Sequence, residues 1–263
     1  MPSPTKKTST RKMKRSATAF RAAAALGAAA ALLVALGGCG RTDTTAPSSV
    51  RTTDVRARFG PVDCREAKCV ALTFDAGPSE HSARLLDILK EEQVPATFFL
   101  MGRKHIDRYP ALVRRMADEG HELANHTWTH RRLTDLEPEE IREELTRTDD
   151  AIERLTGHRP TLMRPPQGRT DATVHEICRD LGLAEILWSV TAKDYATTDS
   201  DLITRRVLTQ VSRDGIILLH DLYDGTVPAV PGIIDALKKR GYVFVTVPQL
   251  LAPGKAEPGK VYR

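Results

Sequence analysis

Short apolar runs alternate with amphipathic stretches from residue 70 to near the end of the chain. In the amphipathic stretches apolar side chains recur every three or four residues, which is typical of helices with one buried face. This alternation favours an α/β fold with a parallel sheet, and about seven units favour a barrel, complete or incomplete, over an open sheet. The predicted strands are 70–74, 96–101, 121–124, a run that ends at Arg164, 184–190, 216–220 and 242–247. The predicted helices are 83–89, 110–119, 138–155, 174–181, 201–211 and 230–240.

Residues 1–38 have the pattern of an export signal. A basic stretch precedes an apolar run at 22–36, and the tetrapeptide Leu36-Gly37-Gly38-Cys39 follows. The run is shorter than the about 20 apolar residues that cross a bilayer, and small residues before a cysteine are typical of lipoprotein signals. We therefore expect cleavage before Cys39, lipidation of Cys39 and a domain outside the cytoplasm, anchored to the cell membrane. A plain signal peptide, which would give a secreted protein, and a retained membrane anchor are the alternatives.

The segment after the signal is polar. Residues 41–58 are rich in Thr, Ser and Arg without an apolar period, so we predict a flexible, lipid-anchored linker over 39–60 and one domain over 61–263. Loss of residues 1–38 removes seven basic residues and no acidic one, which leaves 32 basic against 34 acidic residues and a net charge of −2. The mature chain therefore has no excess of positive charge, and we expect no nucleic-acid partner.

Three cysteines remain besides Cys39. Cys64 and Cys69 lie five residues apart just before the first strong strand, and export to an oxidising space favours a small disulfide loop between them. Cys178 falls in a helical pattern, where a buried, inert thiol is expected rather than a nucleophile.

Polar residues gather directly after the predicted strands. In α/β barrels the active site lies at the carboxyl ends of the strands, so these residues are the candidates for chemistry. They are Asp75, Asn125, His126, His130, Arg164, Thr191, Asp194, His220 and Asp221.

Two pairs among these residues suit metal-assisted hydrolysis. His126 and His130 are four residues apart, a spacing that puts two imidazoles on the same side of a helical turn and suits one metal ion. Asp75 and His220 could act as acid and base across that ion, one taking a proton from the attacking water and the other giving one to the departing amine. As alternatives, Asp75 is an ordinary turn residue before Gly77-Pro78, and His220 is a strand-end histidine bonded to Asp221.

Five motifs in order resemble those of the NodB-homology polysaccharide deacetylases, also called carbohydrate esterase family four. The motifs are TFDAGP at 73–78, HTWTH at 126–130, RPPQG at 164–168, the stretch that ends in Asp194 and Tyr195, and LLHD at 218–221. The resemblance covers roughly residues 69–250. It implies a distorted (β/α) barrel and metal-dependent removal of N-acetyl groups from N-acetylglucosamine polymers, or less often of acetyl groups from xylan.

The resemblance also implies a role for each matching residue. Asp75 matches the catalytic base, His220 the catalytic acid, Arg164 the arginine that orients the base, and Asp194 the carboxylate that would raise the pKa of His220 and keep it protonated. His126 and His130 match two of three metal ligands, and a divalent ion, zinc or alternatively cobalt, is implied. The remaining matches are to substrate contacts: the backbone N–H of Gln167 for the oxyanion, and Tyr195 and Leu218 for the acetyl pocket.

The sequence departs from the family pattern at three positions. Tyr195 replaces the common tryptophan and Gln167 the common tyrosine, and both changes are tolerable because the first residue stays aromatic and the second can act through its backbone. Ala76 stands where the family usually has a second aspartate that ligates the metal. Losing this carboxylate should weaken metal binding.

Three interpretations of Ala76 stay open. The metal is held by His126 and His130 with Asp75 or water, or Glu80 or His81 supplies the missing ligand, or the domain only binds glycan. Because the base, the acid, Arg164 and both histidines remain, we favour an active enzyme. A lipid anchor at the outer face of the membrane favours peptidoglycan as the glycan substrate, and an esterase acting on xylan or another carbohydrate is a further alternative.

Other conspicuous side chains receive ordinary structural interpretations. We expect His105, His158 and His175 to be surface or loop histidines and His121 to be a packed residue. Trp128 and Trp188 are expected to pack around the site rather than to stack on sugar.

Overall fold

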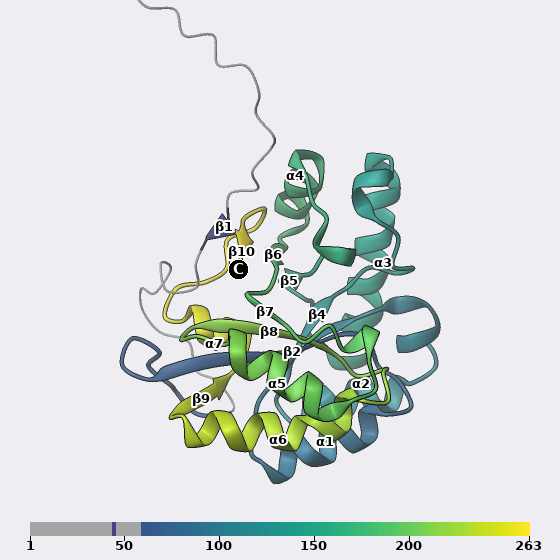
Figure 1. The fold of residues 1–263 in the computed structure, drawn as a ribbon. Coiled ribbons are helices and arrows are strands. Elements are labelled where there is room, and N and C mark those ends of the chain that lie inside the picture. The colour runs from purple at the N-terminus through teal and green to yellow at the C-terminus, as the bar shows by residue number, and fades with distance from the viewer. Residues whose placement is uncertain (1–43, 46–58) are drawn as a thin grey trace, which may run out of the picture. The chain divides into compact units, whose positions relative to one another are not determined.

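The domain is built on one curled sheet of parallel strands. The computed structural model describes residues 59–263 and the backbone of Thr44 and Thr45. The export signal, Cys39 and most of the predicted linker lie outside the described residues. Within the described part of the chain, helices cover the outer side of the sheet (Figure 1).

The strand order is β1-β10-β6-β5-β4-β3-β2-β8-β7, and β9 pairs with the first residues of β2. Every pairing is parallel. The sheet therefore curls around an interior without closing, as an incomplete (β/α) barrel. Its strands are β1 (Thr44–Thr45), β2 (Lys68–Gly77), β3 (Thr97–Leu100), β4 (Glu122–Asn125), β5 (Leu162–Met163), β6 (Ala184–Ile186), β7 (Val190–Thr191), β8 (Gly215–His220), β9 (Tyr242–Val245) and β10 (Val261–Tyr262).

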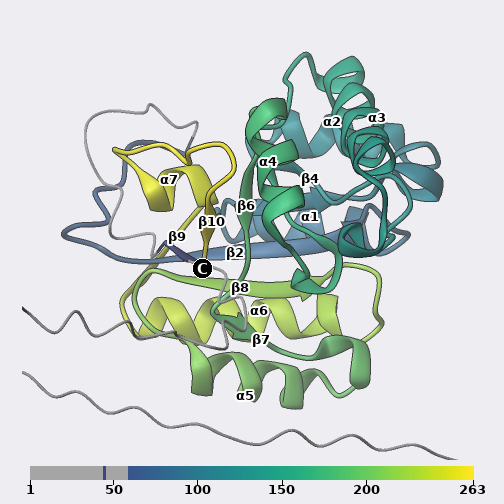
Figure 2. The ribbon, with the colours of Figure 1, turned by 90° about the horizontal axis from the view of Figure 1, so that it is seen from above.

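The outer helices form a series in which each packs on the next, from α5 through α6, α1, α2 and α3 to α4. This series follows the strand order and can be traced in Figures 1 and 2. The described residues contain no helix that is long and apolar enough to cross a membrane. The helices are α1 (Ser82–Glu91), α2 (Pro110–Asp118), α3 (Pro138–Thr156), α4 (Ala172–Leu181), α5 (Ser200–Gln210), α6 (Thr226–Lys239) and α7 (Val247–Leu251).

Strand β2 is the centre of the sheet and shows how the sequence aims side chains at the site. Nine of its ten residues are buried, and its side chains alternate between the two faces. Val70, Leu72 and Phe74 belong to the core under the helices, together with Leu85 and Leu86 of α1. Ala71 belongs to the second core, inside the curl of the sheet. The same alternation puts Thr73 and Asp75 on the inner face, where β2 ends.

The structure corrects several predicted boundaries. The predicted strand 184–190 is two strands, because β6 pairs with β5 and β10 whereas β7 pairs with β8. Helix α6 begins at Thr226, before the predicted start at 230. The predicted strand 242–247 ends at Val245, and the unpredicted helix α7 follows, with Thr246 as its N-cap. Strand β10 is a further unpredicted strand. Its two residues are too few for an alternation of apolar and polar positions to be recognised in the sequence.

Two residues of the predicted linker lie in a strand. Thr44 and Thr45 form strand β1, which pairs in parallel with Val261 and Tyr262 of β10. A two-residue strand in a polar segment leaves no apolar alternation in the sequence from which it could be predicted.

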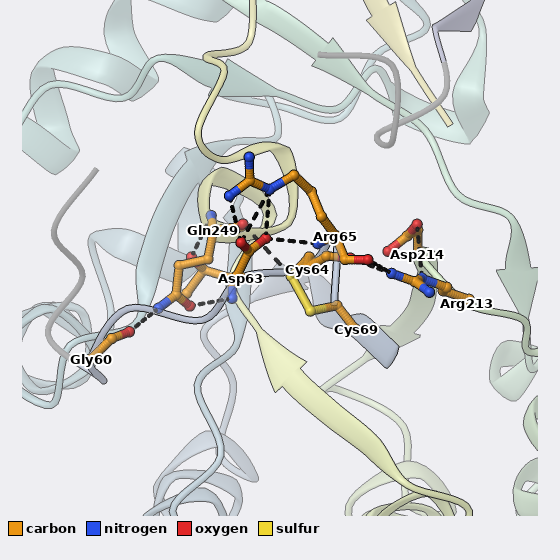
Figure 3. The surroundings of a disulfide bond; sticks show 9 residues. Gly60, Asp63, Cys64, Arg65, Cys69, Arg213, Asp214 and Gln249 are labelled. Carbon is orange, nitrogen blue, oxygen red and sulfur yellow. Dashed lines mark hydrogen bonds and ion pairs between the residues drawn. A yellow bond between two sulfur atoms is a disulfide. The ribbon is translucent and has the colours of Figure 1, made fainter. Parts of the chain in front are cut away.

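Cys64 and Cys69 form a disulfide at the start of the described domain (Figure 3). The disulfide loop is tied to the turn before β8, since Arg213 Nη2 donates to the Cys64 carbonyl oxygen at 2.8 Å and Asp214 N donates to the Cys69 carbonyl oxygen at 2.8 Å. Cys178 is a buried free thiol whose pKa is raised by burial. This environment agrees with the inert thiol that the sequence predicts.

Candidate active site

Arg164 and Asp75 form a buried ion pair across the interior of the sheet. Arg164 Nη1 lies 2.6 Å from Asp75 Oδ1 and also donates to Thr73 Oγ1 at 2.8 Å. The rest of the guanidinium donates to the carbonyl oxygens of Ile186 and Leu187, and its carbon lies 4.0 Å from the centroid of the Phe99 ring. The guanidinium is therefore fixed on all sides and holds one oxygen of Asp75 in place.

His220 lies beside Asp75 because of the strand register. Asp75 and His220 are paired residues in the ladder between β2 and β8. Paired residues of neighbouring parallel strands project to the same face of the sheet. The structure thus brings the predicted base and the predicted acid together at the carboxyl end of the sheet.

Asp194 orients His220 through two hydrogen bonds, and a third, from Thr226, holds Asp194 itself. The Asp194 carboxylate accepts from the His220 ring Nδ1 at 2.9 Å, from the His220 backbone N–H at 2.7 Å and from Thr226 Oγ1 at 2.8 Å. Burial lowers the pKa of His220, but the hydrogen bond to Asp194 and the charges of Asp194 and Asp75 outweigh burial and raise this pKa above its ordinary value. His220 therefore bonds to Asp194 rather than to Asp221, and its Nε2 is left for other partners.

The two histidines of HTWTH meet in a loop, not on a helical turn. Residues 126–130 are not helical, and Thr127 and His130 have left-handed φ values of 69° and 62°. The imidazoles of His126 and His130 nevertheless lie close, with ring centroids 4.9 Å apart. The predicted helical turn is wrong, and the proximity that it was meant to explain arises from the fold of the loop.

Polar side chains of α3 hold this loop. Asn125 Oδ1 accepts from Thr127 N at 2.7 Å, while Asn125 Nδ2 donates to Asp149 Oδ1 of α3 at 2.7 Å. Glu144 of α3 accepts from the backbone N–H and the hydroxyl of Thr129, at 2.7 Å and 2.5 Å. These contacts fix the loop that places both imidazoles.

The residues present fit a divalent metal, although the donor set is small. Within residues 59–263 no group of three or more His, Cys, Asp or Glu side chains stands ready to hold an ion. Burial lowers the pKa of His126 to about 4 and also lowers that of His130, so both rings are neutral at pH 7, as metal ligands must be. His126 Nδ1 donates to the Arg164 carbonyl oxygen at 2.8 Å, which leaves its Nε2 lone pair 3.8 Å from Asp75 Oδ2. A backbone acceptor on the second ring nitrogen is the arrangement found for metal-ligating histidines.

Ala76 has a backbone conformation that suits an aspartate. Its φ is 61°, in the left-handed region. That region costs an L-residue about 1–2 kcal/mol, and Asp and Asn adopt it several times more often than other residues with a side chain. The Ala76 side chain is buried next to Asp75. An aspartate at position 76 would therefore need no change of backbone.

The three predicted substrate contacts lie on separate elements. Gln167 lies in a short turn after β5 with φ of 60°, and its side chain accepts from Arg132 Nε at 2.8 Å. Leu218 is buried in β8, two residues before His220. Tyr195 is 57% exposed, and its ring packs edge to face on His220 with centroids 6.3 Å apart. Tyr195 and Leu218 therefore flank His220.

Comparison with known proteins identifies the family. A sequence model described as polysaccharide deacetylase matches residues 63–186. The chain is also 37% identical over 212 residues to a chitooligosaccharide deacetylase of Bradyrhizobium sp. (strain ANU 289), a match that covers 74% of this chain and 95% of that protein. The chain belongs to the polysaccharide deacetylase family. The family resemblance predicted from the five motifs is thus confirmed.

Another relative in the polysaccharide deacetylase family is longer than this chain. The peptidoglycan-N-acetylglucosamine deacetylase PgdA of Listeria monocytogenes is 36% identical over 217 residues, which are 82% of this chain and 44% of that protein. The chain thus spans less than half the length of this relative.

Solved structures of the polysaccharide deacetylase family confirm the fold. A T48 deacetylase with substrate has a TM-score of 0.74 and 41% identity, over 77% of this chain and 100% of that chain. A mutant, with restored enzymatic activity, of a pseudoenzyme of carbohydrate esterase family four has a TM-score of 0.67 and 32% identity, over 71% of this chain and 68% of that chain.

Sequence reasoning missed several residues that shape this polysaccharide deacetylase site. Tyr223 packs on His220 with ring centroids 5.4 Å apart, and Thr226 shares the Asp194 carboxylate. His105, expected on the surface or in a loop, lies in an irregular helical turn (Gly102–Ile106) and is half-buried, with its Nδ1 3.0 Å from the Pro78 carbonyl oxygen. The polar cluster near LLHD could have indicated Tyr223 and Thr226, but no pattern in the sequence links His105 to Pro78.

We predict that Asp194→Asn lowers the pKa of His220, because the effects of Asp194 that raise this pKa are lost, whereas the burial that lowers it remains. An NMR titration of the His220 ring measures this shift. The raised pKa stabilises the folded chain fully below the unfolded pKa of about 6.5, and this stabilisation disappears as the pH rises through the folded pKa. The substitution should therefore cost more unfolding free energy at acidic than at alkaline pH. The control is Asp224→Asn, which changes an exposed carboxylate beside His81. An equal shift of the His220 pKa in both variants would contradict the assignment of Asp194 as the partner that raises this pKa.

Proposed function

We propose that the chain is a metal-dependent hydrolase that removes N-acetyl groups from a polysaccharide containing N-acetylglucosamine, with peptidoglycan as the leading substrate. The observation that carries this proposal is the register of β2 and β8, which sets Asp75 opposite His220, each with its own buried partner. A base and an acid on the same face can work on the two sides of one acetamide carbon.

Asp75 is proposed as the base. Arg164 occupies its Oδ1, so its Oδ2, which faces His126 Nε2 at 3.8 Å, can accept the proton of the attacking water. The ion pair with Arg164 also fixes the carboxylate in the position that this step needs.

His220 is proposed as the acid. Its Nδ1 donates to Asp194, so a proton on Nε2 can pass to the nitrogen of the departing amine. The raised pKa of His220 favours the protonated ring that must be present before the C–N bond breaks.

His126 and His130 are proposed to hold the metal, zinc or alternatively cobalt, with weaker affinity than a site that also has a carboxylate at position 76. A bound divalent ion would lower the pKa of water and polarise the acetyl carbonyl. The backbone N–H of Gln167 is proposed to donate to the oxyanion, and Tyr195 and Leu218 are proposed to line the acetyl pocket around His220.

We also propose that the protein works outside the cytoplasm on the cell's own wall. The basic stretch, the apolar run and Leu36-Gly37-Gly38-Cys39 support a signal over 1–38, lipidation of Cys39 and a linker over 39–60 before the domain at 61–263. The disulfide between Cys64 and Cys69 suits an oxidising compartment. The name of the Listeria monocytogenes relative supports peptidoglycan as the substrate.

A second candidate function is glycan binding without turnover. Ala76 favours it, because the site lacks one carboxylate, and the similarity to a structure described as a pseudoenzyme supports it. An esterase acting on xylan is a third candidate, supported by similarity to a bifunctional xylanase/deacetylase of Pseudobutyrivibrio xylanivorans at 34% identity.

Acetate release is the test of the proposed activity. We expect the protein to release acetate from N-acetylglucosamine oligomers and the rate to rise with added zinc or cobalt, because two neutral imidazoles bind the ion only weakly. Acetylated xylan is the parallel substrate. No metal-dependent acetate from any substrate would contradict the enzymatic function.

Ala76→Asp is the matched variant in the same assay. It returns a carboxylate at a position whose backbone already suits aspartate, so we expect activity at lower metal concentration than in the natural chain. If only this variant is active and the natural chain binds the oligomers without turnover, the glycan-binding function holds instead.

The peptidoglycan substrate has a separate test in cells. In a strain that lacks the gene, the muropeptides should contain less glucosamine and more N-acetylglucosamine than in the parent strain, and the natural gene should restore the parental ratio. An unchanged glucosamine content would contradict peptidoglycan as the substrate.

A further inference from the structure

Asp221 is a buried carboxylate at the end of β8 that no step of the proposed reaction uses. It is fully buried and directly follows His220, the proposed acid. Neighbouring residues at the end of a strand send their side chains to opposite faces. His220 therefore lies on the inner face beside Asp75, whereas the Asp221 carboxylate reaches Ser82 at the start of α1, one of the outer helices.

Two serines tie Asp221 to the turn between β2 and α1. Ser82 Oγ donates to Asp221 Oδ2, and Ser79 Oγ donates to the Asp221 carbonyl oxygen at 2.6 Å. Both hydroxyls also accept from the backbone of the turn: Ser82 Oγ accepts from Ser79 N at 2.7 Å, and Ser79 Oγ accepts from His81 N at 3.0 Å. Each hydroxyl thus acts as donor and acceptor at once, so Asp221 and this turn form one hydrogen-bonded unit.

The Asp221 carboxylate also packs against the last residue of β2. A Cβ atom added to Gly77 would collide with both carboxylate oxygens, so only glycine fits there while Asp221 stays in place. Gly77 is two residues beyond Asp75, and the pairing of β2 with β3 shifts register between these two residues. The backbone that follows the proposed base therefore runs directly against Asp221. Met101 N donates to the Gly77 carbonyl oxygen at 3.0 Å, so its amide reports on the position of Gly77.

Stability alone does not account for an aspartate at this position. Asp221 Oδ1 accepts no hydrogen bond within residues 59–263, and burial raises the pKa of Asp221 to about 6. Burying a carboxylate with an unpartnered oxygen costs free energy that an apolar side chain of similar size would not cost. The contacts with Gly77 and the serine turn give the carboxylate a use that an apolar side chain cannot supply.

The ladder between β2 and β8 ends at the pair of Asp75 and His220. Beyond this pair, the contacts of Asp221 join the two chains. Arg164 and Asp194 act differently, because the first orients the side chain of Asp75 and the second orients the ring of His220. Asp221 instead acts on the backbones that carry both side chains.

We propose that Asp221 is a positioning residue that joins the end of β2 to the end of β8 and thereby holds Asp75 and His220 at the separation that the reaction needs. The inference rests on the proposed function of these two residues. The base and the acid act on the same acetamide, so a shift of one strand end against the other by about 1 Å should slow the reaction strongly.

The first test observes the link without turnover. Ser82→Ala removes one contact of Asp221 and leaves β8 unchanged. In the purified full chain we expect it to shift the NMR signals of the His220 ring and to speed hydrogen exchange at the Met101 amide. In an Asp221→Ala background, Ser82→Ala should cause no further shift, because the two side chains act through one link. Asp235→Ala, which changes an exposed carboxylate on α6, is the control and should leave both measurements unchanged.

The second test separates positioning from stability. At saturating zinc, Asp221→Ala should lower kcat for acetate release from N-acetylglucosamine oligomers at least about tenfold, with KM nearly unchanged. Asp221→Asn keeps an oxygen that can accept from Ser82, so it should lose less activity. All variants are assayed at a temperature at which circular dichroism shows them folded. If Asp221→Ala does not fold, Ser82→Ala and Asp221→Asn carry both tests.

The two tests fail in different ways. The proposal is overturned if Ser82→Ala leaves the His220 signals and the Met101 exchange rate unchanged, or if folded Asp221→Ala keeps the natural kcat or changes only KM. If the natural chain releases no acetate, the proposed function is contradicted, and the NMR and exchange measurements still decide whether Asp221 joins the two strand ends.

Discussion

The fully buried guanidinium of Arg164 ties together the inner face of the sheet. It connects the end of β5 to Asp75 of β2 and to the carbonyl oxygens after β6, over the ring of Phe99. A buried charge that loses its partner costs about 3–5 kcal/mol, so Arg164 and Asp75 each require the other. The same contacts fix the proposed base, Asp75, and leave one of its oxygens available. Structure and proposed chemistry therefore depend on one ion pair.

The balance of charge explains why position 76 matters for the proposed metal site. Arg164 neutralises Asp75, and His126 and His130 are neutral because they are buried. Without a second carboxylate the site offers a divalent ion little negative charge. We therefore expect an affinity below that of a site with two histidines and a carboxylate.

Much of this site could be predicted from the sequence, because parallel strands bring their carboxyl ends to one edge. An apolar run precedes each of four site residues, and the fold brings these four together at the carboxyl ends of the strands. They are Asp75, His126, Arg164 and His220. The pairing of His220 with Asp194 followed from the family resemblance, and the structure forms it.

The rest depends on contacts that leave no local pattern. The HTWTH loop is held by Glu144 and Asn125 rather than by helical hydrogen bonds, so its spacing of four wrongly suggested a helical turn. His105 is held against the loop after β2 by a hydrogen bond to Pro78, 27 residues away in the sequence. Strands β1 and β10 are too short to show a period and are ordered by pairing with a neighbour.

The most direct test of the account is the rate of acetate release by Asp75→Asn from N-acetylglucosamine oligomers at saturating zinc. The asparagine keeps the shape of the side chain but cannot accept the proton of the attacking water. Loss of a general base typically lowers the rate by about 10²–10⁴-fold, and we expect a loss in that range, with Asp87→Asn on the surface of α1 as the unaffected control. An Asp75→Asn protein that releases acetate at the natural rate would contradict the assignment of the base and the mechanism built on the Arg164–Asp75 pair.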